Sequence, residues 1–205
     1  MLALLVGWVM SNSVQEGDRW TVERTMQYVQ EIEHVDVKNV DKLKFLVLEA
    51  SPETTAISCE VIPVESSTTK ASKKVNSFKP GGVLQSREDT SDLNLARINR
   101  MEWTATEARQ GIEWSRNWPA SSDLLEAKVN VKPTSHSATD TTLLVTYKEG
   151  ENTKCVATIK VLNRVRVVED LALTINNVLV PGATKPGSLI VSEKLKEIQL
   201  VGRRD

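Results

Sequence analysis

Polar and apolar side chains alternate over long stretches of this chain. From Trp20 to Ile32 the even positions include Trp20, Val22 and Met26, whereas the odd positions are mostly Thr, Glu, Gln and Val. A period of two is typical of a strand with one face in the core and one in water, whereas a helix repeats every 3.6 residues. The pattern predicts a long, half-buried strand that begins at Trp20 and extends to His34.

A second alternating run places apolar side chains at odd positions from Cys155 to Ile175. Strands usually contain about 3–10 residues, so one strand of this length is improbable. Asn163 and the pair Glu169-Asp170 are natural places for a turn or a bulge. Shorter runs predict further strands over residues 43–50, 55–64, 124–131, 141–147 and 198–201.

Loops and helices account for the remaining segments. Short helices are expected over residues 91–101 and 192–200, although the second stretch also fits a strand. The polar stretch 66–77 predicts a loop or the edge of a hairpin, and residues 176–188, with two Pro and two Gly, predict a long loop. We therefore expect a mainly β, antiparallel protein: a strongly curved sheet or a two-sheet half-barrel, with one or two short helices.

The chain also contains a weak internal repeat. Gly17-Asp18-Arg19-Trp20 is echoed by Gly111-Ile112-Glu113-Trp114, and residues 44–61 align with residues 128–145. We expect a single β domain over residues 14–205, in which residues 17–100 and 111–205 form two similar halves. Alternating strands also align by chance, so coincidence is the other explanation.

These motifs resemble a family of uncharacterised secreted bacterial β-rich proteins with a Gly-Asp-x-Trp opening and two similar halves. The residues that carry the resemblance are Gly17, Asp18, Trp20, Gly81, Val83, Gly111 and Trp114. The second opening departs from the pattern, because Ile112 replaces the aspartate. The resemblance implies a secreted β protein and supplies no activity.

The N-terminal residues have the pattern of an export signal. An apolar run over residues 2–10 is followed by Ser11-Asn12-Ser13, which predicts a signal peptide over residues 1–13 with cleavage after Ser13. No Lys or Arg precedes the run, and the alternative is an apolar segment packed in the core. The run is too short for a membrane span of about 20 residues. We expect a periplasmic or extracellular protein.

Composition excludes some classes of partner. The net charge is −1 and basic residues form no stripe, so we expect no nucleic-acid binding. No second apolar run approaches membrane length, so we also expect no integral membrane span. The partner is unknown; an apolar small molecule or an envelope protein are the candidates.

Few residues suggest chemistry. His34 and His136 lack metal-ligand spacing, and no nucleophile or phosphate-binding motif occurs, so we expect no catalytic residue, cofactor or metal and no enzyme activity. Cys59 and Cys155 lie on the apolar phases of their strands. In an oxidising compartment they could form a disulfide, and otherwise they are two buried free thiols.

Trp103, Trp114 and Trp118 cluster within a short segment of a chain that has few aromatic residues. They could line a groove for an apolar or sugar ligand, or they could anchor the core, which is the more common fate of tryptophan. The leading hypothesis is an exported, non-catalytic binding or structural module of the bacterial envelope. The alternatives are a carrier of a lipid or other apolar ligand on the concave sheet face, and an envelope hydrolase.

Overall fold

The computed structural model describes residues 14–51, 54–65, 70–79, 83–84, 106–120, 125–165, 167–179 and 182–202. The predicted signal peptide (1–13), the predicted helix over 91–101, Gly81 and Trp103 lie outside these residues.

The described chain forms one open antiparallel sheet of eleven strands, in the order β5-β4-β3-β2-β1-β11-β10-β9-β8-β7-β6. α3 (Thr106–Arg109) is the one helix among the described residues. The mainly β, antiparallel fold expected from the alternation is therefore confirmed. The strands are β1 (Arg19–Gln30), β2 (Val35–Ala50), β3 (Thr55–Glu65), β4 (Ser72–Lys79), β5 (Val83–Leu84), β6 (Trp114–Trp118), β7 (Ala127–His136), β8 (Asp140–Glu149), β9 (Asn152–Leu162), β10 (Val168–Leu179) and β11 (Pro186–Gln199).

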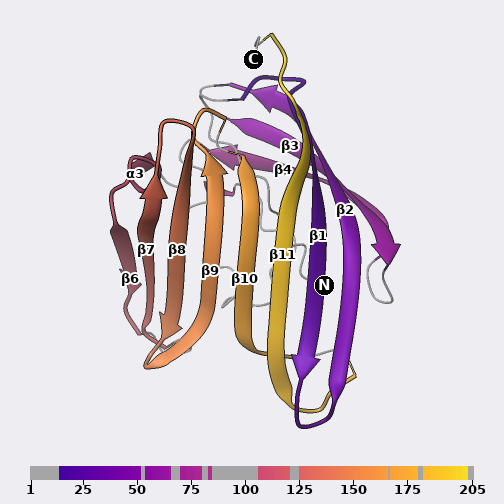
Figure 1. Ribbon diagram of the computed structural model, residues 1–205, viewed down its shortest axis with the longest axis vertical. Helices are drawn as coiled ribbons and strands as arrows, with labels where there is room; N and C mark the ends of the chain where they lie inside the picture. The colour runs from indigo at the N-terminus through magenta and orange to yellow at the C-terminus, as the bar shows by residue number, and fades with distance from the viewer. Residues whose placement is uncertain are drawn as a thin grey trace.

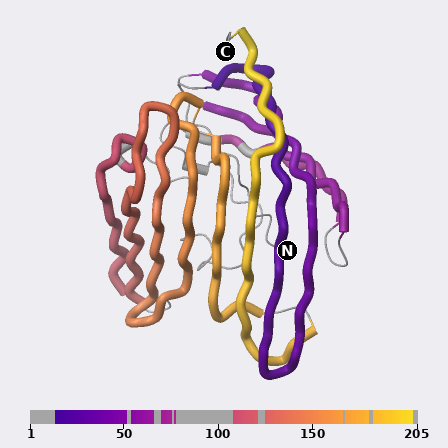
Figure 2. The backbone as a smooth tube through the Cα atoms, in the orientation of Figure 1, coloured from indigo at the N-terminus to yellow at the C-terminus, as the bar shows by residue number. Residues whose placement is uncertain are grey.

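The sheet consists of two meanders joined edge to edge. Strands β1 to β5 form one meander and β6 to β11 the other, and the two join where β1 pairs with β11. The sheet is curved: β3 and β4 cross the upper part of the molecule at a steep angle to β8–β11 (Figure 1). The backbone trace shows the same bend (Figure 2).

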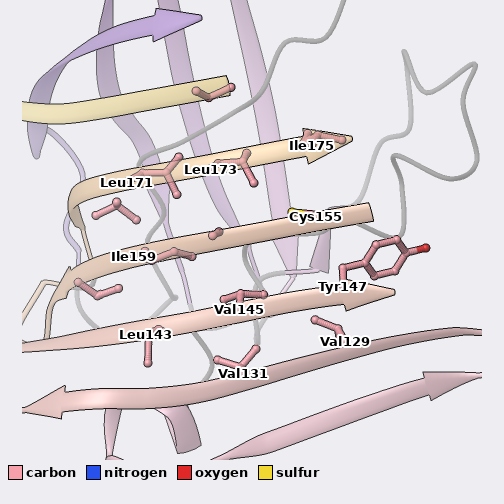
Figure 3. Packing of buried hydrophobic residues seen from close by; sticks show 14 of the residues in the cluster. Val129, Val131, Leu143, Val145, Tyr147, Cys155, Ile159, Leu171, Leu173 and Ile175 are labelled. Atoms are coloured by element: carbon pink, nitrogen blue, oxygen red, sulfur yellow. The ribbon is translucent and has the colours of Figure 1, made fainter. Parts of the chain in front are cut away.

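The apolar phase of the strands forms one face of the sheet, which we call the inner face. Its larger cluster unites apolar side chains of β7–β11 with Met26 and Ala108. Figure 3 shows the part of this cluster that β7–β10 contribute. Its smaller cluster surrounds Trp20, whose ring stacks on Phe45 with ring centroids 5.1 Å apart. The burial of Trp20 expected from the strand phase is confirmed, since it is 2% exposed.

The first predicted strand ends earlier than the alternation suggests. β1 stops at Gln30, and residues 31–34 form a turn in which His34 has φ of 51°. The Gln30 side-chain oxygen accepts hydrogen bonds from the amides of Ile32 and Glu33, at 2.6 and 3.1 Å, and so stabilises the turn. The prediction that His34 lies on a strand is therefore wrong, because these turn hydrogen bonds override the side-chain alternation.

The second alternating run divides as expected. β9 ends at Leu162 and β10 begins at Val168, so the break at Asn163 is confirmed. The register of β10 against β9 also shifts between Val168 and Asp170, where a bulge was expected.

The C-terminal region is more regular than the sequence indicates. β10 continues to Leu179 and β11 begins at Pro186, so the long loop over 176–188 is wrong. The helix over 192–200 and the separate strand over 198–201 are also wrong, because β11 runs to Gln199. β11 pairs with β10 and β1, and this backbone pairing on both sides outweighs the local pattern. In the polar stretch 66–77, residues from Ser72 onward form β4, which agrees with the hairpin alternative.

Candidate functional site

The tryptophans of β6 lie on the inner face at one edge of the sheet. Trp114 pairs with Val131 and Trp118 with Ala127, and both β7 partners belong to the larger apolar cluster. Both rings are half-buried and pack against that cluster. We call Trp114, Arg116 and Trp118 the tryptophan edge.

Aromatic and cationic groups contact each other at this edge. The ring of Trp118 meets Tyr147 edge-on, with centroids 6.3 Å apart. The guanidinium carbon of Arg116 lies 5.4 Å from the Trp118 ring centroid, which is cation–π distance. The edge thus offers partly exposed aromatic surface beside a positive charge.

A buried carboxylate lies next to the tryptophan edge. The hydroxyl of Tyr147 donates a hydrogen bond to Glu149 Oε1 at 3.0 Å, and Lys154 Nζ lies 3.8 Å from Glu149 Oε2. Tyr147 is fully buried and Glu149 is 7% exposed. These partners compensate the buried carboxylate for the water that it loses on folding.

Three charged side chains form a row across the middle of the inner face. Arg24 on β1 pairs in register with Asp41 on β2 and with Glu193 on β11. Arg24 Nη2 donates to Asp41 Oδ2 at 2.7 Å, and both side chains are almost completely buried. Glu193 is 2% exposed. We call these three residues the buried charged row.

The buried charged row influences its neighbours electrostatically. Burial raises the pKa of Tyr28, while the charge of Arg24 lowers it and that of Asp41 raises it. Burial also raises the pKa of the Cys59 thiol to about 12, with a smaller lowering by Arg24 and a raising by Glu193. Cys59 therefore stays protonated at neutral pH and is a poor nucleophile.

No motif in the sequence marks the buried charged row. One signal was present, because Arg24 occupies an apolar-phase position between Val22 and Met26. A charged residue in that phase must be buried with a partner or must break the strand. Which residues supply the partner depends on strand pairing, and the pairing joins β1 to β11 across most of the chain length.

The two cysteines are buried and free in the structure, which matches the alternative of two buried thiols rather than a disulfide. Cys59 on β3 belongs to the smaller cluster and Cys155 on β9 to the larger one. Four strands lie between β3 and β9 in the sheet, a path of about 24 Å along the sheet at 4.8 Å per strand. A disulfide requires Cα atoms roughly 4.4–6.8 Å apart.

His136 belongs to a structural network at the end of the sheet that carries the β7–β8 turn. Its Nδ1 lies 2.9 Å from Thr141 Oγ1, which also donates toward Asn163 Oδ1 and the Arg109 carbonyl. Thr141 is fully buried. Its hydroxyl therefore connects β8 with α3, through the Arg109 carbonyl, and with the β9–β10 turn, through Asn163. His34 is exposed in its turn. Among the described residues, no group of three or more His, Cys, Asp and Glu side chains could hold a metal ion.

Two solved structures are weakly similar to this chain. No family model and no curated protein matches the chain. A hypothetical protein from Chlamydia trachomatis has 12% identity and a TM-score of 0.34, over 98% of this chain and 96% of its own. A DUF1329 family protein from Desulfovibrio piger has 5% identity and a TM-score of 0.35, over 92% of this chain and 88% of its own. In the described part of the chain, helices of membrane-spanning length and hydropathy are absent.

Proposed function

We propose that this chain is an exported, non-catalytic binding or structural module of a bacterial envelope. The observation that carries the proposal is the filled inner face. Apolar side chains of five adjacent strands are at most 2% exposed there, including Val131, Val145, Cys155 and Leu173 (Figure 3) and also Val191. A carrier of apolar ligands needs an apolar cavity that the ligand can enter.

The chemistry of the described side chains also favours a non-catalytic role. The Cys59 thiol is held protonated, and the Thr141 hydroxyl is buried among three partners. Neither group has the exposure that an attacking nucleophile needs. The tryptophan edge acts in this proposal as an anchor that closes the larger apolar cluster.

A titration with an apolar fluorescent probe tests the module against the carrier. We expect no saturable change in tryptophan fluorescence. Replacing both Trp114 and Trp118 with Leu should lower the free energy of unfolding, because the rings stabilise the cluster. Saturable binding that the double replacement abolishes without a change in melting temperature would make the carrier the better function.

The predicted export has its own test. Protein isolated from an envelope fraction should begin at Val14, as read by N-terminal sequencing or mass spectrometry. Peptides from residues 1–10 in the mature protein would contradict cleavage after Ser13.

A further inference from the structure

Residues 14–18 form a turn that is fixed to the sheet by backbone hydrogen bonds. The Asp18 amide donates to the Gln15 carbonyl at 3.0 Å, which closes the turn. The Gly17 amide donates to the Val47 carbonyl, and the Val47 amide donates to the Asp18 carbonyl, both at 2.9 Å. We call residues 14–18 the N-terminal turn. These bonds hold the N-terminal turn against β2.

The first residue of the N-terminal turn is also held by its side chain. Val14 is 5% exposed and belongs to the smaller apolar cluster, together with Trp20 and Val167. Burial of a valine side chain is favourable, because apolar surface leaves water. The backbone of Val14 is therefore restrained both by this packing and by the bonded turn that follows it.

The Asp18 carboxylate lies at the centre of the N-terminal turn and is fully buried. Its Oδ2 accepts a hydrogen bond from the Gln15 amide at 2.8 Å, and its Oδ1 accepts one from the Val201 amide at 2.7 Å. Both of these donors are neutral. A carboxylate has about four acceptor sites, so Asp18 can accept a hydrogen bond from a cation in addition to those from the two amides.

The backbone nitrogen of Val14 is close to this carboxylate. Consecutive backbone nitrogens are at most about 3.7 Å apart, because only one Cα and one carbonyl carbon separate them. Gln15 N is 2.8 Å from Asp18 Oδ2, so Val14 N lies within about 6.5 Å of that oxygen. Opposite charges favour each other over about 4–6 Å, and burial strengthens their attraction.

We propose that cleavage after Ser13 creates an α-ammonium group on Val14 that pairs with the buried Asp18 carboxylate, so that removal of the signal peptide stabilises the mature fold. Hydrolysis of the peptide bond consumes one water molecule and leaves a carboxylate on Ser13 and an amine on Val14. The amine takes up a proton and is mostly an ammonium at neutral pH. In the precursor the same nitrogen is an uncharged amide. The inference rests on the proposed export and adds what processing does to the folded chain.

Two recombinant forms of the chain test the pairing. One form begins at Val14, and the other carries one extra Gly before Val14, which moves the ammonium group away by about 3.7 Å. A residue also precedes Val14 in the precursor, so the extra Gly follows the precursor's own covalent structure. Urea denaturation should give the form that begins at Val14 a folding equilibrium constant roughly tenfold higher, because hydrogen bonds between charged groups are the stronger class.

Two variants identify the partner of the ammonium group. Asp18→Asn removes the negative charge and should abolish the difference between the two forms. The matched control is Glu16→Gln, because Glu16 is an exposed carboxylate of the same turn. This control should leave the difference between the two forms unchanged.

A labelling rate provides a second measurement, which is made on the folded protein and does not depend on stability. An aldehyde that condenses selectively with α-amines should label the form that begins at Val14 at least about tenfold more slowly than the Gly-extended form, because only an unprotonated amine reacts. In the Asp18→Asn background, the two forms should be labelled at similar rates.

Several outcomes would overturn the proposal. These are equal folding constants for the two forms, a difference that persists in Asp18→Asn, or a difference that Glu16→Gln abolishes. Equally slow labelling in Asp18→Asn would assign the protection to burial alone. A native N-terminus other than Val14 would contradict the predicted cleavage, and with it the role of the ammonium group in the mature protein. Equal folding constants together with a native N-terminus at Val14 would overturn the pairing and leave the export intact.

Discussion

The two meanders begin with the same Gly-x-x-Trp spacing, but the two tryptophans differ in how deeply they are buried. Gly17 and Gly111 have φ of +88° and +81°, and each precedes a strand that carries the tryptophan at or next to its first residue. Trp20 is 2% exposed on a central strand, whereas Trp114 is half-buried on an edge strand. The local motif thus specifies a turn followed by a strand, and the neighbouring strands specify the burial.

A second difference is an aspartate that is present only in the first opening. Asp18 is fully buried, and its carboxylate accepts hydrogen bonds from the amides of Gln15 at 2.8 Å and Val201 at 2.7 Å. Its backbone carbonyl accepts a hydrogen bond from Val47. Asp18 therefore connects the N-terminal turn, the upper end of β2 and the C-terminal turn. Ile112, at the equivalent position, is 53% exposed.

Truncation of the two tryptophans should give the largest contrast. Trp20→Ala should lower the free energy of unfolding by about 3–5 kcal/mol, because it leaves a cavity beside Phe45. Trp114→Ala should cost about 1–2 kcal/mol, since its ring is only half-buried. Urea denaturation of both variants measures the contrast, and equal losses would show that burial does not separate the two openings.

Removal of the Asp18 carboxylate should have the next largest effect. Asp18→Ala should cost about 2–3 kcal/mol, because two amides lose their charged acceptor. Asp18→Asn keeps one acceptor oxygen and should lie between wild type and Asp18→Ala. Hydrogen exchange at the Val201 amide should accelerate in the Ala variant. An unchanged exchange rate would mean that the carboxylate does not hold the C-terminal turn.

The two glycines provide a matched pair of smaller effect. Both Ala variants would have positive φ, which costs about 1–2 kcal/mol for a residue with a side chain. At Gly17 the added Cβ would also lie 3.0 Å from Val201 Cγ2, whereas at Gly111 its nearest neighbour is His136 Cγ at 3.5 Å. Gly17→Ala should therefore melt at a lower temperature than Gly111→Ala. The reverse order would contradict the close approach of Gly17 to the C-terminal turn.

Restoring the aspartate in the second opening should have the smallest effect. Ile112→Asp should change the free energy of unfolding by less than about 0.5 kcal/mol, as is usual for an exposed position. Chemical denaturation measures this change. A gain of 1 kcal/mol or more would show that the second opening also has a partner for the aspartate.

Local pattern predicted most of the strands but not all of their ends. The break at Asn163 and the bulge near Asp170 followed from an alternating run that exceeds the length of one strand. The end of β1 at Gln30 did not, because the side-chain hydrogen bonds of Gln30 define the turn. β11 was ambiguous because its residues suit a helix or a strand until β1 and β10 pair with them.

Candidate chemistry was less predictable than the strands. The tryptophan edge was visible because two tryptophans at a spacing of four in a strand lie on the same face. The buried charged row was missed because Arg24, Asp41 and Glu193 meet only through strand pairing. The contact between the β1–β2 turn and the β10–β11 turn was missed for the same reason, since Glu33 and Thr184 are far apart in the chain and close only in the folded sheet.

The sequence by itself determined the side-chain alternation, and with it the antiparallel β fold and the residues that face the core. This follows because alternation at period two is a local property of an extended backbone. Only the tertiary structure decided that β1 joins β11, that Trp20 is central while Trp114 lies at an edge, and that the two cysteines stay apart. These outcomes depend on which strands become neighbours, and neighbours far apart in sequence leave no periodic signal within either segment.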